Sequence, residues 1–237
     1  MSTPILIGLF LLLPLAAGGW VRMVPANADR IKLLLAFSGA FLLSVTVLHM
    51  LPELYERGGE GVGPWVLGGF LLQVVLEFFS RGIEHGHVHV HAQKGASHAL
   101  PLATLLSLCV HSFTEGVPFA DPRVGGDIPF VTGVLLHKMP MAIALATVLR
   151  RSGVPAGRSW TMLGIFASAA PLGILMGTLW GDRLGDAFLS RALALAIGML
   201  LHISTTIIFE STPDHRFNAK RFVTVLLGAA LGYLTVH

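Results

Sequence analysis

Apolar runs of about twenty residues recur along the whole 237-residue chain, and they constrain its fold more than any other feature. The hydrocarbon core of a bilayer is about 30 Å thick, so each spanning helix needs roughly 20 apolar residues. Charged residues make up 12% of the sequence, whereas a typical soluble domain has about 25%. We therefore expect an all-α polytopic membrane protein in which one transmembrane domain fills residues 1–237.

Eight spans are predicted from these runs. They are approximately Pro4–Val21, Ile31–Leu54, Gly61–Arg81, Ala99–Phe119, Asp127–Leu149, Ser159–Trp180, Ala187–Glu210 and Phe222–Val236. The first run has no basic residue before it, so it is interpreted as a retained helix rather than a signal peptide. Pro140 and Pro171 fall within spans, where each removes a backbone hydrogen bond and is expected to kink or unwind its helix.

Lys and Arg residues are unevenly distributed between alternate connections. Eleven of the sixteen fall on one side of the membrane and four on the other, with Lys138 inside a span. Because Lys and Arg favour cytoplasmic loops, we expect both termini outside and residues 82–98 in the cytoplasm, in a plasma membrane or bacterial inner membrane. The same loops explain the pI of 9.4, so no nucleic-acid partner is expected.

Ionisable side chains are concentrated in the fourth and fifth spans. His111 and Glu115 lie one helical turn apart in the fourth span, and His137 and Lys138 lie in the fifth. Ionisable groups inside a membrane are costly and therefore indicate function. Two imidazoles and one carboxylate match the ligand preference of Zn²⁺ and its divalent neighbours. The alternative is that these histidines only form hydrogen bonds between helices.

Three further groups of polar residues have a metal-handling and a structural interpretation. His49 and Glu53 are either an entrance relay or an interfacial hydrogen-bonded pair. In the loop 82–98, four histidines alternate with Gly or Val: His85, His87, His89 and His91. They form either a cytoplasmic chelator or part of a solvated polar segment. The candidates for an exit are His202, Glu77 and Glu210. The alternative for His202 is core hydrogen bonding, and the alternative for Glu77 and Glu210 is that they are solvated helix ends.

Several of these segments resemble the ZIP (Zrt/Irt-like) metal transporters over nearly the whole chain. The matching phrases are His111-Ser112-Phe113-Thr114-Glu115-Gly116, His137 followed by Pro140, and Leu48-His49-Met50-Leu51-Pro52-Glu53. The resemblance implies a bundle of eight helices with both ends outside. It also implies movement of Zn²⁺ into the cytoplasm, or in some members of Fe²⁺, Mn²⁺ or Cd²⁺.

The chain departs from the family pattern at three positions. Many members carry Glu where this chain has Met141, and members that hold two metals use polar residues where this chain has Lys138 and Ala170. A lysine ammonium beside Glu115 can take the place of the second cation. We therefore expect a single-metal transport site, with Ser112 and Met141 left open as further ligands.

The function expected from these residues is transmembrane transport of a divalent transition metal, zinc first, with Fe²⁺, Mn²⁺, Cd²⁺ or Co²⁺ as other substrates. No organic cofactor is expected, the lipid bilayer is the surrounding partner, and a homodimer stays open. One alternative is an intramembrane zinc-dependent hydrolase, although the sequence contains no His-Glu-x-x-His motif. The other alternative is a membrane protein that senses metal without carrying it.

Overall fold

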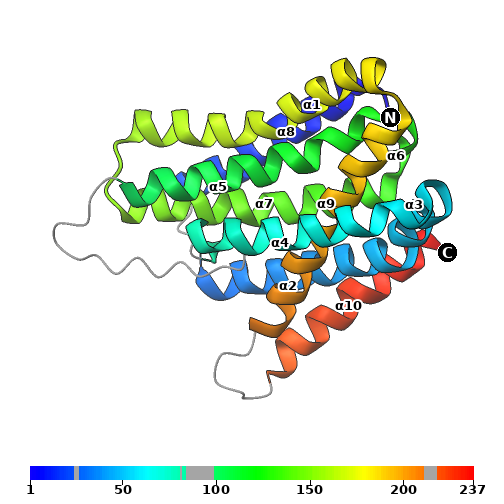
Figure 1. Ribbon diagram of the computed structural model, residues 1–237. Helices are drawn as coiled ribbons and strands as arrows, with labels where there is room; N and C mark the ends of the chain where they lie inside the picture. The colour runs from blue at the N-terminus through cyan, green and yellow to red at the C-terminus, as the bar shows by residue number, and fades with distance from the viewer. Residues whose placement is uncertain (24–26, 81, 84–98, 211–217) are drawn as a thin grey trace.

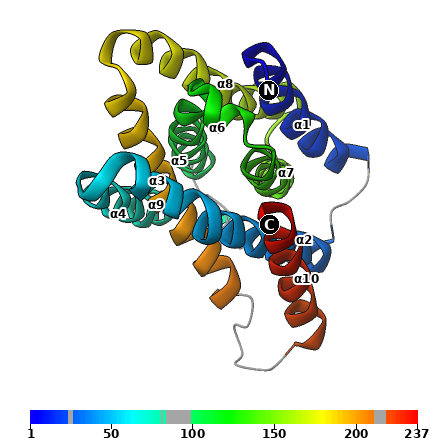
Figure 2. The same cartoon turned by 90° about the vertical axis from the view of Figure 1, so that its right-hand side faces the viewer.

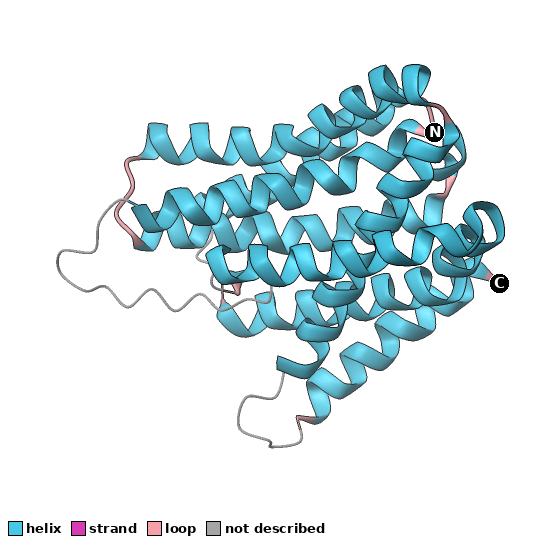
Figure 3. Cartoon of the chain, viewed as in Figure 1, coloured by secondary structure: helices cyan, strands magenta, loops and turns pink. Residues whose placement is uncertain are grey.

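The computed structural model describes residues 1–23, 27–80, 82–83, 99–210 and 218–237, and every regular element in these ranges is helical (Figure 3). Eight helices are long and apolar enough to cross a membrane. The predicted all-α, eight-span fold class is therefore confirmed. Both termini lie at the same end of the bundle (Figure 1), as an even number of crossings requires.

The spans follow the chain in simple order. The elements are α1 (Thr3–Met23), α2 (Ala28–Val45), η1 (Thr46–Met50), α3 (Leu51–Gly58), η2 (Gly59–Val62), α4 (Gly63–Ser80), α5 (Ala99–Gly116), η4 (Val117–Ala120), α6 (Pro122–Gly126), α7 (Ile128–Arg151), α8 (Ala156–Leu184), α9 (Asp186–Glu210) and α10 (Ala219–Val236). The second span comprises α2, η1 and α3 together, so the fourth and fifth spans are α5 and α7.

The second span contains a π-helical turn, η1, that the sequence analysis did not predict. Pro52 is the second residue of α3, which follows this turn, and it has no backbone N–H to donate to the Leu48 carbonyl one turn earlier. π turns of this kind occur often at functional sites. His49 lies inside the widened turn.

Two expectations about helix ends and prolines need correction. The predicted connection Gly181–Asp186 is wrong, because α8 continues to Leu184 and only Gly185 separates it from α9. Gly185 has a φ of 74°, which lets the chain reverse within one residue. Of the two outcomes expected at Pro140 and Pro171, unwinding is wrong, because α7 and α8 are each helical on both sides of the proline, and a kink stays a prediction.

The spanning helices form two groups of four, which Figure 2 shows nearly end-on. In the first group α1 packs on α7 and α8, and α5 packs on α8. In the second group α2 packs on α9 and α10, and α4 packs on α9. The groups meet where α2 contacts α7 and where α4 contacts α5. The candidate site residues predicted in the fourth and fifth spans are therefore in the first group, close to its boundary with the second.

Glycines allow two helix pairs to approach to backbone contact. A Cβ atom on Gly116 would collide with the Ala170 carbonyl group, and one on Gly173 would collide with that of Phe113, which joins α5 closely to α8. Gly69 and Gly198 do the same between α4 and α9. Small residues serve this purpose in membrane helix packing, where close van der Waals contact replaces the hydrophobic effect.

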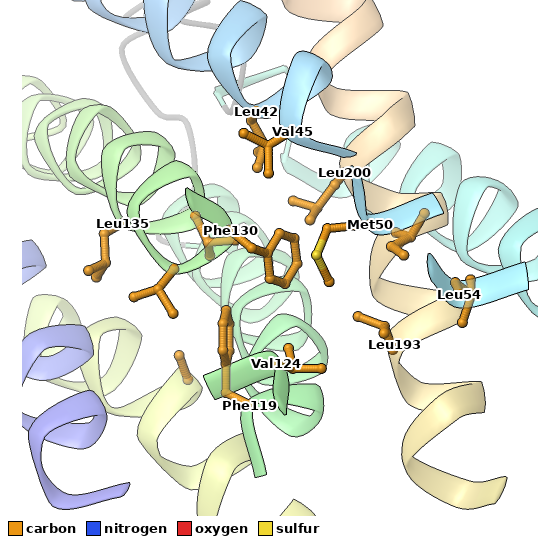
Figure 4. Close-up of a cluster of buried hydrophobic side chains, with 14 of the residues drawn as sticks. Leu42, Val45, Met50, Leu54, Phe119, Val124, Phe130, Leu135, Leu193 and Leu200 are labelled. Carbon is orange, nitrogen blue, oxygen red and sulfur yellow. The ribbon is translucent and has the colours of Figure 1, made fainter. Parts of the chain in front are cut away.

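A hydrophobic cluster connects the two groups near the end of the bundle that carries the termini (Figure 4). Phe130 of α7 and Phe119 of η4 stack with ring centroids 5.4 Å apart. Met50 of η1 and Leu200 of α9 belong to the same cluster. Between this cluster and the opposite end, the polar residues of α5 and α7 face each other.

Candidate metal centre

His111, Glu115 and His137 come together in the interior of the bundle, as the sequence analysis expected them to. His111 and Glu115 project from α5 and His137 projects from α7, and each residue is at most 1% exposed. One potential ligand atom of each lies within 4.8 Å of those of the other two. We refer to these three residues as the central cluster.

The geometry of the central cluster is close to that of a metal site. His111 Nε2 is 2.8 Å from Glu115 Oε1, and the two imidazole rings are edge to face with centroids 6.1 Å apart. Ligand atoms around a tetrahedral Zn²⁺ lie about 3.4 Å from one another, given metal–ligand distances of about 2.0–2.1 Å. Small side-chain adjustments are therefore enough for the three groups to share one cation.

Lys138 occupies the space beside this cluster. Its Nζ donates to Glu115 Oε2 at 2.6 Å, and the lysine has no exposed surface. The two oxygens of Glu115 are thus divided, with Oε1 toward His111 and Oε2 toward the ammonium group. The ring centroid of Phe10, on α1, lies 5.9 Å from Nζ.

Gln73 of α4 is a member of this site that the sequence analysis missed. Its Oε1 is 2.9 Å from His111 Nδ1, and Gln73 is fully buried. If Nδ1 carries the proton and donates it to Gln73, then Nε2 is left as a lone-pair ligand facing Glu115. A search restricted to ionisable groups passes over an amide, but a glutamine within an apolar span was the available signal.

Ser112 and Met141 are both fully buried but differ in their surroundings. Met141 belongs to a hydrophobic cluster with Leu108 and Leu145, which accounts for it as a packing residue. The Ser112 hydroxyl has no hydrogen-bond partner among the described residues.

His49 and Glu53 form part of a second group, which also includes an unpredicted carboxylate. His49 Nε2 is 2.6 Å from Asp127 Oδ2 and 3.9 Å from Glu53 Oε2. Asp127 is the N-cap residue of α7 and was assigned no function from the sequence, because its position in the chain gave no indication of this contact. We refer to His49, Glu53 and Asp127 as the outer cluster.

Two of the three predicted exit residues are also in contact. His202 Nε2 on α9 lies 2.9 Å from Glu77 Oε2 on α4, and Thr206 bonds back to the His202 carbonyl. Glu77 is one helical turn beyond Gln73 on α4, toward the end opposite the termini. The side chain of Glu210 and the loop histidines His85, His87, His89 and His91 lie outside the described residues.

A pair of charged residues caps the bundle near the outer cluster. Asp121 accepts four hydrogen bonds from the guanidinium and backbone of Arg123, the shortest at 2.8 Å. Burial alone would raise the pKa of Asp121, but the hydrogen bonds and positive charge of Arg123 outweigh it and hold that pKa below its usual range. Asp121 therefore remains a carboxylate at neutral pH.

Fold and site together define a multi-pass α-helical membrane protein with two histidines and one glutamate gathered in its interior. The sequence profile described as "ZIP Zinc transporter" matches residues 84–235, and the chain belongs to this family. The expected family assignment is thus confirmed. The description of this family names a zinc transporter rather than an enzyme, which gives no support to the hydrolase alternative.

Named relatives agree with this assignment. The chain is 30% identical to zinc transporter ZIP13 of Bos taurus over 212 residues, which cover 70% of this chain and 49% of the relative. It is 25% identical to zinc transporter ZIP9-B of Xenopus laevis over 148 residues, covering 61% and 48%. It is 33% identical to zinc transporter ZIP1 of Takifugu rubripes over 95 residues, covering 38% and 30%. The chain thus spans about half the length of the first two of these curated relatives.

Proposed function

We propose that this protein carries a divalent transition metal, zinc first, across the membrane through the central cluster. The observation that supports the proposal most directly is the burial of two imidazoles and one carboxylate within 4.8 Å of one another on facing helices. Zn²⁺ accepts such a ligand set, and a site with three protein ligands keeps a coordination position open. An open position suits a carrier because the ion can exchange ligands on its way in and out.

Charge is the reason to propose one ion rather than two. Glu115 is the only carboxylate of the central cluster, and its charge is already matched by the ammonium group of Lys138. At about 4 Å and an effective dielectric constant of about 20, two unit charges repel by about 4 kcal/mol, and a divalent ion beside Lys138 by about twice that. A second ion in this space is therefore excluded while Lys138 is present, and the first ion is bound weakly enough to leave.

A route for the ion follows from the polar residues at either side of the central cluster. We propose that His49 and Glu53 form the entrance relay and that Glu77 with His202 forms the exit. Gln73 and Glu77 are one turn apart on α4, so they connect the central cluster to this exit. The expected direction is into the cytoplasm, with both termini outside and the histidine loop, residues 82–98, as a chelator on the inner side.

Zinc uptake into liposomes that contain the purified protein tests the proposal. His111→Ala and His137→Ala should each lower the uptake rate at least about 100-fold, and His237→Ala should leave it unchanged. His237 is a suitable control because its ring packs against Tyr233 and it belongs to neither cluster. Uptake that survives both substitutions in the central cluster would remove the basis of the proposal.

The same assay separates transport from the remaining alternative. A metal sensor would bind zinc without filling the liposomes, and it would lose its response when residues 84–98 are deleted. A transporter keeps its flux after that deletion. Substitution of zinc by Fe²⁺, Mn²⁺, Cd²⁺ or Co²⁺ in the same assay defines the substrate, and the mass of the solubilised protein tests the homodimer.

A further inference from the structure

We infer that the outer cluster, His49, Glu53 and Asp127, is a complete metal-binding site in which Asp127 is the third ligand. The inference rests on the proposed function for the kind of ion, a divalent transition metal. It differs from the relay of His49 and Glu53 by adding a residue from the other group of helices. The three ligand atoms lie within 4.8 Å of one another.

Each carboxylate of the outer cluster uses one oxygen for the protein and directs the other toward His49. Asp127 Oδ1 accepts the backbone N–H of Phe130 at 2.8 Å, which fixes the side chain as a helix cap, and Oδ2 faces His49 Nε2. Glu53 Oε1 is in an ion pair with Arg57, and Oε2 faces the same nitrogen. The two oxygens that remain and the imidazole nitrogen therefore converge on one position.

The backbone holds these ligands without relying on the ion. The π turn Thr46–Met50 carries His49, and α3 carries Glu53 one turn later. Asp127 starts α7, so its position is fixed by the helix that also carries His137. A cation held by all three residues would join the second span to the fifth, that is, one group of four helices to the other.

The composition and exposure of the outer cluster fit a divalent ion that arrives from water. Imidazole nitrogens and carboxylate oxygens are both ligands of Zn²⁺, and the two carboxylates bring two negative charges toward the ion. The side chains are 35%, 29% and 13% exposed for His49, Glu53 and Asp127, so an ion can reach them with part of its hydration shell. Arg57 pairs with the other oxygen, Glu53 Oε1, and because Arg57 is 39% exposed, solvent screens its repulsion of an ion.

The test uses the full chain with the histidines of the central cluster and of the cytoplasmic loop removed. In that background, Ala replaces His85, His87, His89, His91, His111 and His137. Calorimetric titration with Zn²⁺ should then show one bound ion per chain. His49→Ala should abolish this binding, and Asp127→Asn should weaken it at least tenfold. Asn retains the helix cap, so this substitution removes the charge and leaves the start of α7 intact.

Asp121→Asn is the matched control. Asp121 also caps a helix, α6, and lies near the outer cluster, but its carboxylate faces Arg123 rather than His49. This variant should bind one ion with unchanged affinity. A background protein that binds no zinc, or one that keeps its ion after both His49→Ala and Asp127→Asn, overturns the inference.

A second measurement avoids the multiply substituted background. In the otherwise natural chain, His49→Ala and Asp127→Asn should each raise the KM for zinc uptake about tenfold and change kcat less than twofold. An unchanged KM in both variants contradicts the inference while the proposed transport stands. Absence of flux in the natural chain, with one ion still bound by the background protein, rejects the transport proposal and leaves this site in place.

Discussion

The central and outer clusters use the same ligand chemistry in different surroundings. His137 and Asp127 lie on the same helix, α7, ten residues and therefore about 15 Å apart. The central cluster is at most 1% exposed, and its carboxylate touches the buried ammonium of Lys138. The outer cluster is partly exposed, and its cation, Arg57, is 39% exposed. An ion is therefore repelled by a fixed buried charge at the centre and by a solvent-screened charge at the outer end.

The difference indicates separate tasks for the two clusters. Two carboxylates near water can collect a hydrated cation, whereas a single carboxylate shared with an ammonium group favours release. The substitutions below run from the largest expected effect to the smallest. They test whether the different surroundings of the two clusters account for different metal affinities and transport roles.

The largest effect is expected from Glu115→Gln, because it leaves the Lys138 ammonium buried without its partner. Breaking a buried ion pair on one side costs about 3–5 kcal/mol. The variant should lose both zinc flux and thermal stability in detergent. The double variant Glu115→Gln, Lys138→Met should recover most of the lost Tm but none of the flux. If the single variant unfolds like the natural protein, the pair contributes little to stability.

Lys138→Met tests the fixed charge directly. Without the ammonium group, Glu115 can give both oxygens to the ion, so the affinity for Zn²⁺ should rise at least tenfold and the uptake kcat should fall. Arg57→Met is the corresponding change in the outer cluster and should alter affinity less than threefold, because an exposed pair contributes about 0–1 kcal/mol. Calorimetry on both variants measures the two changes in Zn²⁺ affinity. Equal changes would contradict the expected difference between the buried and the exposed cation.

Gln73→Leu should weaken zinc binding at the central cluster about tenfold, because groups that orient a ligating histidine contribute about 10- to 100-fold to metal affinity. Gln73→Glu keeps an acceptor oxygen at the same distance and should restore most of the loss. The outer cluster, titrated in the background without the central histidines, should respond to neither. If Leu and Glu weaken binding equally, the effect arises from packing rather than from the hydrogen bond to His111.

The smallest effect is expected from Asp121→Asn, which removes the charge facing Arg123. The pKa of Asp121 is lower in the folded protein than its usual value, so its contribution to stability is present above the unfolded pKa, about 3.9. The contribution is lost as the pH falls through the folded pKa. The variant should therefore have a lower Tm at pH 7, by the equivalent of at most about 1 kcal/mol, and a matching Tm at a pH below that folded pKa.

The sequence was sufficient to predict the fold class and the central cluster. The eight spans follow from bilayer thickness, and the spacing of His111 and Glu115 follows from one helical turn, so both are local properties of the chain. Gln73 and Asp127 could not be found in this way. Their partners lie 38 and 78 positions away in the chain, and only the packing of α4 on α5, and of the second span on α7, brings them together.

The helix ends were also less accessible to prediction. Hydropathy changes gradually at the membrane surface, whereas α8 continues past the apolar region to Leu184 because Gly185 alone can turn the chain. The π turn at Thr46–Met50 depends on how the chain accommodates Pro52 within the packed bundle, and several helical solutions are open to the same residues.

The backbone contact at Gly116 means that residues without any ligand atom help to set the spacing of the central cluster. Gly116 follows Glu115 directly, and a methyl group there would push α5 away from the Ala170 carbonyl group and carry the carboxylate with it. A random mutational screen for lost zinc uptake should therefore recover alanine at position 116 alongside changes of His111 and Glu115. In such a screen, tolerance along α5 would be governed by the width of a helix–helix gap as much as by coordination chemistry.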